Sequence, residues 1–306
     1  MLNRRTFLKI AASLSAAFAL PALPEPVAAA LQAVDPRAVP KLIYLQGLSC
    51  TGCSISLLQA QSPSPLSLIT DYSQLVFHAD LSAASGHLAM EVIERHLSGK
   101  AGDYVLALEG AIPDGMPLAC TIGEKTLAQL LEAAATTMSA AVAVGACASY
   151  GGIPAAEGNL TGAVGLREFF RRRQIDKLVI DIPGCSVHPD WVWHSVIHLV
   201  KVGLPALEEN RPALFFSRKV HETCPRYHDF QQEIFATRLG DPGCLFKLGC
   251  LGPETKADCA NRWWNGGQTW CIDANAPCIG CASPDFALRR QFPFYRLGER
   301  ALSRKG

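Results

Sequence analysis

Residues 41–53 read KLIYLQGLSCTGC, an apolar run of strand length followed directly by a C-x-x-C pair. Four more short apolar runs come later, and two of them also end at a cysteine. These runs are QLVFHA at 74–79, DYVLALEG at 103–110, SAAVAVGAC at 139–147 and KLVIDIPGC at 177–185. Helical patterns lie between them, for example at 86–98 and 123–139. This alternation predicts an α/β fold, with a mostly parallel sheet and helices on both faces.

The pattern changes in the last third of the chain. Residues 215–281 are rich in Gly, Pro, Trp and Cys and show little periodicity, so their core must be small and needs other support. We predict three parts: a signal peptide and lead-in at 1–40, a flavodoxin-like doubly wound domain at 41–207, and a small irregular cluster-binding domain at 208–306.

Charge and cysteine content narrow the function. The chain has 306 residues, with 28 Lys and Arg against 27 Asp and Glu. We therefore expect no basic face of the kind that phosphate backbones require, and no nucleic-acid partner. Twelve cysteines are many for this length, and they require disulfides, metals or iron–sulfur clusters.

The N-terminus has the features of an export signal. Arg4 and Arg5 precede an apolar run at 10–20 and the small residues at 28–30, which predicts a twin-arginine signal and a periplasmic location. An ordinary secretory signal is the alternative. Twin-arginine export carries folded proteins, so exported cysteines need not form disulfides. The apolar run is shorter than the ~20 residues that span a bilayer, and the tail after Phe294 is basic, so we expect no integral membrane anchor.

One set of cysteines follows the predicted strands. Because the carboxyl ends of parallel strands meet at one edge, four thiols distant in sequence are expected to converge there. They are Cys50, Cys53, Cys147 and Cys185. Four thiolates suit a 4Fe-4S cluster or zinc, and buried free thiols are the alternative.

Glu109 and His188 follow strands too, and each is expected to relay protons, face a partner or serve as a structural group.

The second constellation lies in the last third of the chain. Its members are His221, Cys224, Cys244, Cys250, Cys259, Cys271, Cys278 and Cys281. Without Cys120, eleven cysteines and His221 make twelve ligands, which divide into three sets of four. Iron–sulfur centres are usually held by four ligands, and histidine can replace cysteine. Disulfides remain an alternative, although they would leave His221 without a purpose. We expect Cys120 to be a free, partly buried thiol.

Long stretches of the chain resemble the small subunit of NiFe hydrogenases, with particular similarity to the selenium-containing branch. The resemblance covers about 41–295. It is carried by SCTGCS, LEGAIP, VGACASYGGIPAAEGN, PGCSVHPDW, HETCP, PGCLFKLGCLGP, ADCANRWWN and WCIDANAPCIGCASPDF.

The resemblance implies a ligand assignment. The proximal 4Fe-4S cluster would be held by Cys50, Cys53, Cys147 and Cys185. The distal 4Fe-4S cluster would be held by His221, Cys224, Cys244 and Cys250. The medial cluster would be held by Cys259, Cys271, Cys278 and Cys281. Many relatives have proline at the position of Cys271 and a 3Fe-4S medial cluster. We therefore expect 4Fe-4S here, with 3Fe-4S as the alternative.

The resemblance also implies a function. The chain would conduct electrons from the nickel-iron centre of a partner large subunit to an external carrier, such as a soluble multihaem cytochrome c, with H2 activated in the large subunit. Gly52 and Gly152 stand where oxygen-tolerant relatives carry extra cysteines, which implies an ordinary proximal cluster. The alternatives are a stand-alone iron–sulfur carrier, a secreted disulfide or zinc module, and a quinone-reductase subunit, which needs only one cluster.

Overall fold

A computed structural model describes residues 41–288 of the chain. Five parallel strands form its central sheet, in the order β2-β1-β3-β7-β9. They are β1 (Lys41–Gln46), β2 (Gln74–His78), β3 (Tyr104–Glu109), β7 (Ala140–Val144) and β9 (Val179–Ile182). Counted along the chain, these strands have the flavodoxin-like order 2-1-3-4-5. The predicted fold class is therefore confirmed.

The strands are apolar because both faces of the sheet are covered. In β1, Leu42 and Tyr44 belong to one hydrophobic cluster, while Ile43 and Leu45 belong to another on the opposite face. Successive side chains of a strand point to opposite faces, so a strand that is buried on both sides is apolar at nearly every position.

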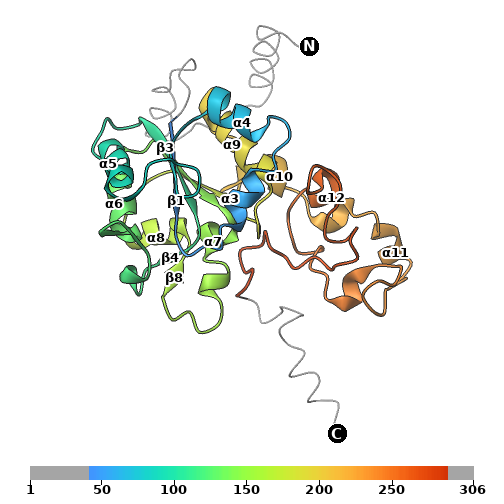
Figure 1. Cartoon of the computed structure of the whole chain (residues 1–306). Coiled ribbons are helices and arrows are strands. Elements are labelled where there is room, and N and C mark those ends of the chain that lie inside the picture. The colour runs from blue at the N-terminus through green and yellow to red at the C-terminus, as the bar shows by residue number, and fades with distance from the viewer. Residues whose placement is uncertain (1–40, 289–306) are drawn as a thin grey trace.

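Helices pack on both faces of the sheet (Figure 1). One face carries α5 (Gly86–Leu97), α6 (Leu127–Thr137) and α8 (Leu166–Arg172), and the other carries α3 (Gly52–Leu57) and α9 (Pro189–Lys201). The predicted helix at 123–139 begins later, at Leu127, because β5 (Thr121–Ile122) and β6 (Lys125–Thr126) form a hairpin before it. Thr126 and Gln129 then form a capping box, which satisfies backbone N–H groups of the first turn.

The remaining elements are short. The helices are α4 (Pro65–Ser67), α7 (Gly145–Tyr150), α10 (Ala213–Phe216), α11 (Tyr227–Gln231) and α12 (Cys259–Arg262). The strands are β4 (Ile112–Pro113), β8 (Ala163–Val164), β10 (Leu207–Glu208) and β11 (Arg211–Pro212). Single turns of other helix types are η1 (Leu68–Tyr72), η2 (Pro117–Ala119), η3 (Ile153–Ala155), η4 (Val220–Thr223) and η5 (Leu245–Leu248).

The C-terminal part shares its core with the sheet. Phe215, Ala257 and Trp270 belong to the same hydrophobic cluster as Leu42 and Trp191. This part, which contains α12, lies on the side of the sheet part where α9 is found in Figure 1. The boundary at 207/208 stays a prediction.

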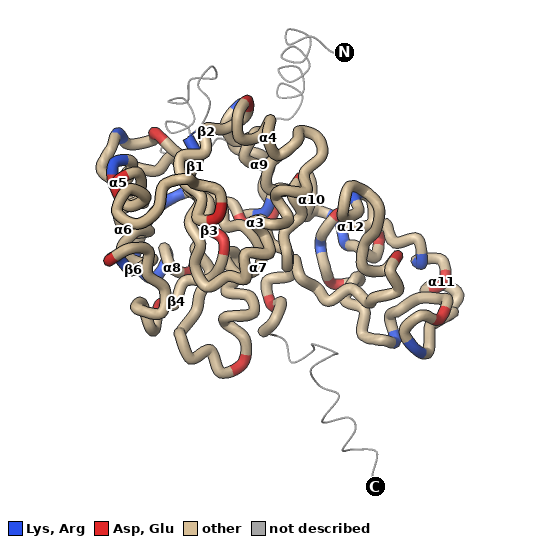
Figure 2. Tube along the Cα trace, in the orientation of Figure 1, with Lys and Arg blue, Asp and Glu red and all other residues tan. Residues whose placement is uncertain are grey.

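Two further features are the distribution of charged residues and the length of the helices. Figure 2 shows both signs of charge on the sheet part and on the C-terminal part. No helix within residues 41–288 combines the length and the apolar character needed to cross a membrane. The predicted export signal at 1–40 and the basic tail after Phe294 lie outside the described residues.

Candidate iron–sulfur sites

The sheet register aligns the carboxyl ends of four neighbouring strands. The aligned end residues are Gln46, Glu109, Val144 and Ile182. Connections leave β1 and β3 toward opposite sides of the sheet, which makes this edge the switch point where doubly wound proteins bind ligands. All four cysteines of the first set follow these strand ends. They are Cys50, Cys53, Cys147 and Cys185, called the first thiol group below.

The thiols of this group interact electrostatically. Burial is the largest cause that raises the pKa of Cys147, to about 11, and the nearby Cys185 and Cys50 raise it further. Burial also raises the pKa of Cys53, and Cys147 and Cys185 are among the further causes. The structure therefore brings together four thiols that span more than a hundred residues of the chain.

Glycines let the backbone approach these sulfurs. Gly145 has φ +84°, and a Cβ there would lie 2.5 Å from the Cys53 sulfur. A Cβ on Gly152 would lie 2.8 Å from the Cys147 sulfur, and one on Gly52 would lie 3.1 Å from the sulfur of its neighbour Cys50. Positions 52 and 152, where the resemblance implies extra cysteines in oxygen-tolerant relatives, are thus next to the first thiol group. The ordinary proximal cluster stays a prediction.

A second group forms at η4 and η5. Burial raises the pKa of Cys224, and the thiols of Cys250 and Cys244 raise it further. His221, three residues before Cys224, packs its ring edge-on against Tyr227 and Phe230, with ring centroids 5.0 and 4.5 Å away. Its Nε2 atom is buried and has no hydrogen-bond partner among the described residues. Buried ring nitrogens are normally satisfied, so this one fits a metal ligand.

A third group consists of Cys259, Cys271, Cys278 and Cys281. Burial raises the pKa of Cys259, and the other three thiols of the group all raise it further. Burial likewise raises the pKa of Cys278 to about 12, with Cys250 of the second group and Cys271 as further causes.

Contacts between residues of different groups show how the three groups are arranged. The backbone N–H of Cys278, in the third group, donates a hydrogen bond to the sulfur of Cys250, in the second, over 3.4 Å. Burial raises the pKa of Cys281, and a backbone hydrogen bond from Cys185 of the first group opposes that rise. The third group therefore lies between the other two.

The donor sets fit iron–sulfur clusters. All twelve cysteines are free thiols. Within residues 41–288, no three His, Cys, Asp or Glu side chains are arranged to hold a single metal ion. The thiols of each group affect one another's pKa, so they lie near one another. Iron–sulfur clusters are held by such groups of thiolates.

Other residues singled out from the sequence have structural partners. His188 accepts from the backbone N–H of Asp190 at Nδ1, which caps α9, and its Nε2 pairs with the carbonyl of Trp263 over 2.5 Å. His188 is therefore a structural group. Cys120 is half-buried, and its thiol donates to the Gln46 carbonyl over 3.8 Å.

Glu109 lies in a hydrogen-bond network that the sequence did not reveal. Its partners Tyr44 and Ser54, and the nearby His78, were not predicted as functional. The one available signal was the position of Ser54, directly after Cys53.

Taken together, the flavodoxin-like sheet and the three ligand groups define an α/β protein of the iron–sulfur class. Comparison with known proteins identifies the family within this class. Residues 216–295 match the family model for the C-terminal region of the NiFe/NiFeSe hydrogenase small subunit. Residues 50–199 match the model of the NADH ubiquinone oxidoreductase 20 kDa subunit.

Individual relatives agree with the first of these models. The periplasmic [NiFeSe] hydrogenase small subunit of Desulfomicrobium baculatum is 38% identical over 313 residues, covering 96% of this chain and 98% of the relative. The hydrogenase-2 small chain of Escherichia coli K12 is 35% identical, covering 92% and 76%. A solved [NiFeSe] hydrogenase from Desulfomicrobium baculatum superposes with a TM-score of 0.78 at 40% identity, covering 81% and 96%.

The chain belongs to the family of NiFe and NiFeSe hydrogenase small subunits. It is the electron-transfer subunit of a heterodimeric hydrogenase, whose partner is a large subunit. The predicted family and function are confirmed.

Proposed function

We propose that the three groups hold three 4Fe-4S clusters that conduct electrons between the large subunit and an external carrier. The first group, Cys50, Cys53, Cys147 and Cys185, would hold the proximal cluster beside the nickel-iron centre of the partner. The third group, Cys259, Cys271, Cys278 and Cys281, would hold the medial cluster. The distal cluster would be held by His221, Cys224, Cys244 and Cys250.

The single observation that carries this proposal is the order of the groups. Two ligand-to-ligand contacts, from Cys278 to Cys250 and between Cys185 and Cys281, support a medial position for the third group. When bound, the clusters supply one-electron acceptors. The chain's own residues bind them, orient them and exclude water. Cys50 and Cys185 are exposed, so the proximal set lies at a surface that is open to a large subunit.

Iron and sulfide analysis of the purified native complex tests the proposal. Three four-iron centres predict about twelve irons and as many sulfides per small chain, in a preparation that also contains the large subunit. Zinc in place of iron, or cystines, would contradict it. A stable, active monomer would instead support a stand-alone carrier.

The fourth medial ligand decides the type of the medial cluster. With Cys271 present, the purified, unoxidised protein is expected to show no three-iron signal by electron paramagnetic resonance (EPR). The Cys271→Pro variant is expected to show that signal, with one iron fewer per chain and a higher medial potential. A three-iron signal in the unmodified protein would refute the medial assignment.

We further propose export by the twin-arginine route to the periplasm, and transfer to a soluble multihaem cytochrome c or a similar carrier. Arg4 and Arg5 support the export route, and the relative from Desulfomicrobium baculatum is named periplasmic. Cell fractionation of a variant with both arginines changed to lysine tests the route. Retention in the cytoplasm is expected, and continued export would point to the ordinary secretory pathway.

Mixing the reduced complex with a tetrahaem cytochrome c tests the carrier, because haem reduction is expected within the mixing time.

A further inference from the structure

A buried carboxylate lies beside the first thiol group. Glu109, the last residue of β3, is 2% exposed. It accepts hydrogen bonds from the backbone N–H groups of Cys53 (3.2 Å) and Ser54 (3.0 Å). It also accepts from the hydroxyls of Ser54 (2.5 Å) and Tyr44 (2.9 Å). Two of these donors belong to the backbone that carries a proximal ligand.

The hydrogens of this network all point toward Glu109. The Nδ1 atom of His78 accepts from the backbone N–H of Asp80 over 3.1 Å, so its proton is on Nε2, which donates to the Ser54 hydroxyl oxygen over 3.2 Å. Gln46 donates to the same oxygen over 3.1 Å. Ser54 must then direct its own hydrogen to Glu109. Four hydrogen bonds, three to Oε2 and one to Oε1, thus end on the Glu109 carboxylate, which is the pattern of an acceptor-only group.

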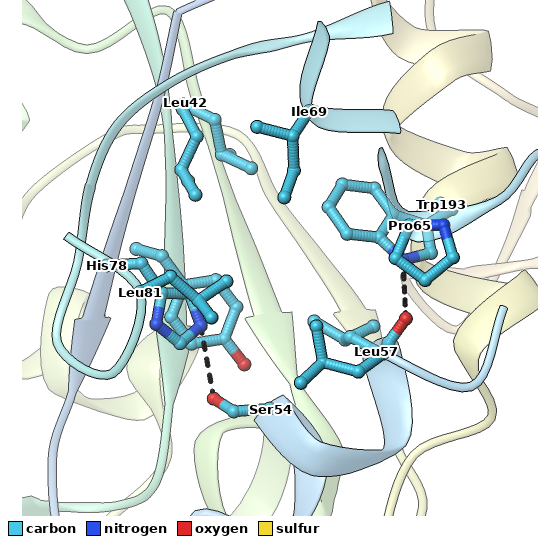
Figure 3. A pocket seen from close by; sticks show the side chains of 11 residues that line it. Leu42, Ser54, Leu57, Pro65, Ile69, His78, Leu81 and Trp193 are labelled. Atoms are coloured by element: carbon cyan, nitrogen blue, oxygen red, sulfur yellow. Dashed lines mark hydrogen bonds between the residues drawn. The ribbon is translucent and has the colours of Figure 1, made fainter. Parts of the chain in front are cut away.

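The surroundings do little to screen this charge. Ser54 and His78 line a pocket together with Leu57, Ile69 and Trp193, so the outer side of the network faces apolar side chains (Figure 3). Burial lowers the pKa of His78, which keeps its ring neutral near pH 7. The four donors to Glu109 are neutral as well. The Glu109 carboxylate is therefore stabilised by hydrogen bonds, but none of these contacts brings an opposite charge to it. Its surroundings are also of low polarity.

The carboxylate lies beside one of the thiol residues. Its Oε1 atom accepts from the backbone N–H of Cys53 over 3.2 Å, and Cys53 belongs to the first thiol group. A negative charge that disfavours a thiolate also disfavours adding an electron to a centre bound to that thiolate.

We propose that Glu109 keeps the reduction potential of the proximal centre low, by its fixed charge and by retaining the N–H groups of Cys53 and Ser54, which cannot then donate to sulfur. Hydrogen bonds to sulfur and local charge are the main protein controls of cluster potential. Glu109 is thus a positioning and tuning residue. This inference rests on the proposed function, because it requires a proximal cluster.

EPR-monitored redox titration of the complete heterodimer tests the inference. Glu109→Gln is expected to raise the proximal midpoint potential on the order of 59 mV, equivalent to tenfold in the reduced-to-oxidised ratio at a fixed potential. Iron content and the other two potentials are expected to stay unchanged. Two controls keep the charge at Glu109: Tyr44→Phe removes one donor, and Glu132→Gln changes an exposed carboxylate elsewhere, and neither is expected to raise the potential.

The outcomes separate the two claims. A Glu109→Gln protein with full iron and an unshifted proximal potential overturns the inference and leaves the proposed function standing. An unmodified protein with no proximal centre overturns the proposed function itself. If Glu109→Gln does not retain iron, Glu109→Asp provides the test, because it keeps the charge. That variant must keep a low potential, and a raised one would overturn the inference.

Discussion

At Gly145 the main chain passes so close to the first thiol group that a methyl group would reach the Cys53 sulfur. Gly145→Ala is therefore expected to prevent assembly of the proximal cluster, with a loss of about four irons per chain. Iron analysis and EPR measure the loss. Gly158→Ala is the matched control, because Gly158 has a similar φ of +96° but nothing within 4 Å of its Cβ position. Equal iron loss in both variants would mean that backbone strain, and not contact with sulfur, is responsible.

The unpartnered ring nitrogen of His221 makes a second prediction possible. His221→Ala is expected to lose or degrade only the distal centre, while the other two keep their EPR signals. His221→Cys is expected to keep four irons at a lower distal potential, because histidine ligation raises the potential relative to cysteine. A normal distal potential in both variants would remove His221 from the ligand set.

Among the elements, α9 ties the C-terminal part to the sheet. The Trp191 indole N–H donates to Asp258 over 2.7 Å, and Arg262 of α12 pairs with Asp190 of α9 over 3.1 Å. Trp191→Phe leaves one part-buried hydrogen bond to a carboxylate unmade, which is expected to cost about 1–3 kcal/mol of local stability.

Limited proteolysis measures this cost as faster cleavage within residues 213–288. Trp193→Phe is the matched control, because the Trp193 indole N–H donates to the Leu57 carbonyl, within the sheet part. Unchanged cleavage in Trp191→Phe would show that the C-terminal part is held by other contacts.

The regular elements were predictable because their signals are local. The five strands are short apolar runs bounded by Gly, Pro or charge, and each is found within two to three residues of its expected ends. The helix at 127–137 was placed too early, since the hairpin before it has no apolar periodicity. Residues 213–288 contain only short helices and single turns, so periodicity could not predict their path.

Some of the candidate sites could be predicted from the sequence more fully than others. The first thiol group followed from the strand-end rule alone. The division of the other eight ligands required a count and a family resemblance, because no sheet orders them. The network at Glu109 could not be predicted, since Tyr44, Ser54 and His78 meet only through the pairing of β1 with β2 and β3.

On the scale of the whole molecule, Cys50 and Cys185 are exposed, so we expect the large subunit to pack against the face that carries them. Ile55 of α3, two residues after Cys53, is 57% exposed. Ile55→Lys is expected to weaken retention of the large subunit during purification at least tenfold, because a buried lysine at an interface costs more than about 1.4 kcal/mol. Leu239→Lys is the control, since Leu239 is similarly exposed (53%) in the C-terminal part. Equal loss in both variants would argue against this face.

The hydrogen bond from the Cys278 amide to the Cys250 sulfur has a consequence for any titration of the molecule. We expect an electron added at the medial site to be felt at the distal site beside it, so these two sites would not fill independently. Their observed midpoints would then belong to the interacting pair, as with coupled acids. The first reducing equivalent would make the second harder to add, which would spread these two apparent midpoints apart.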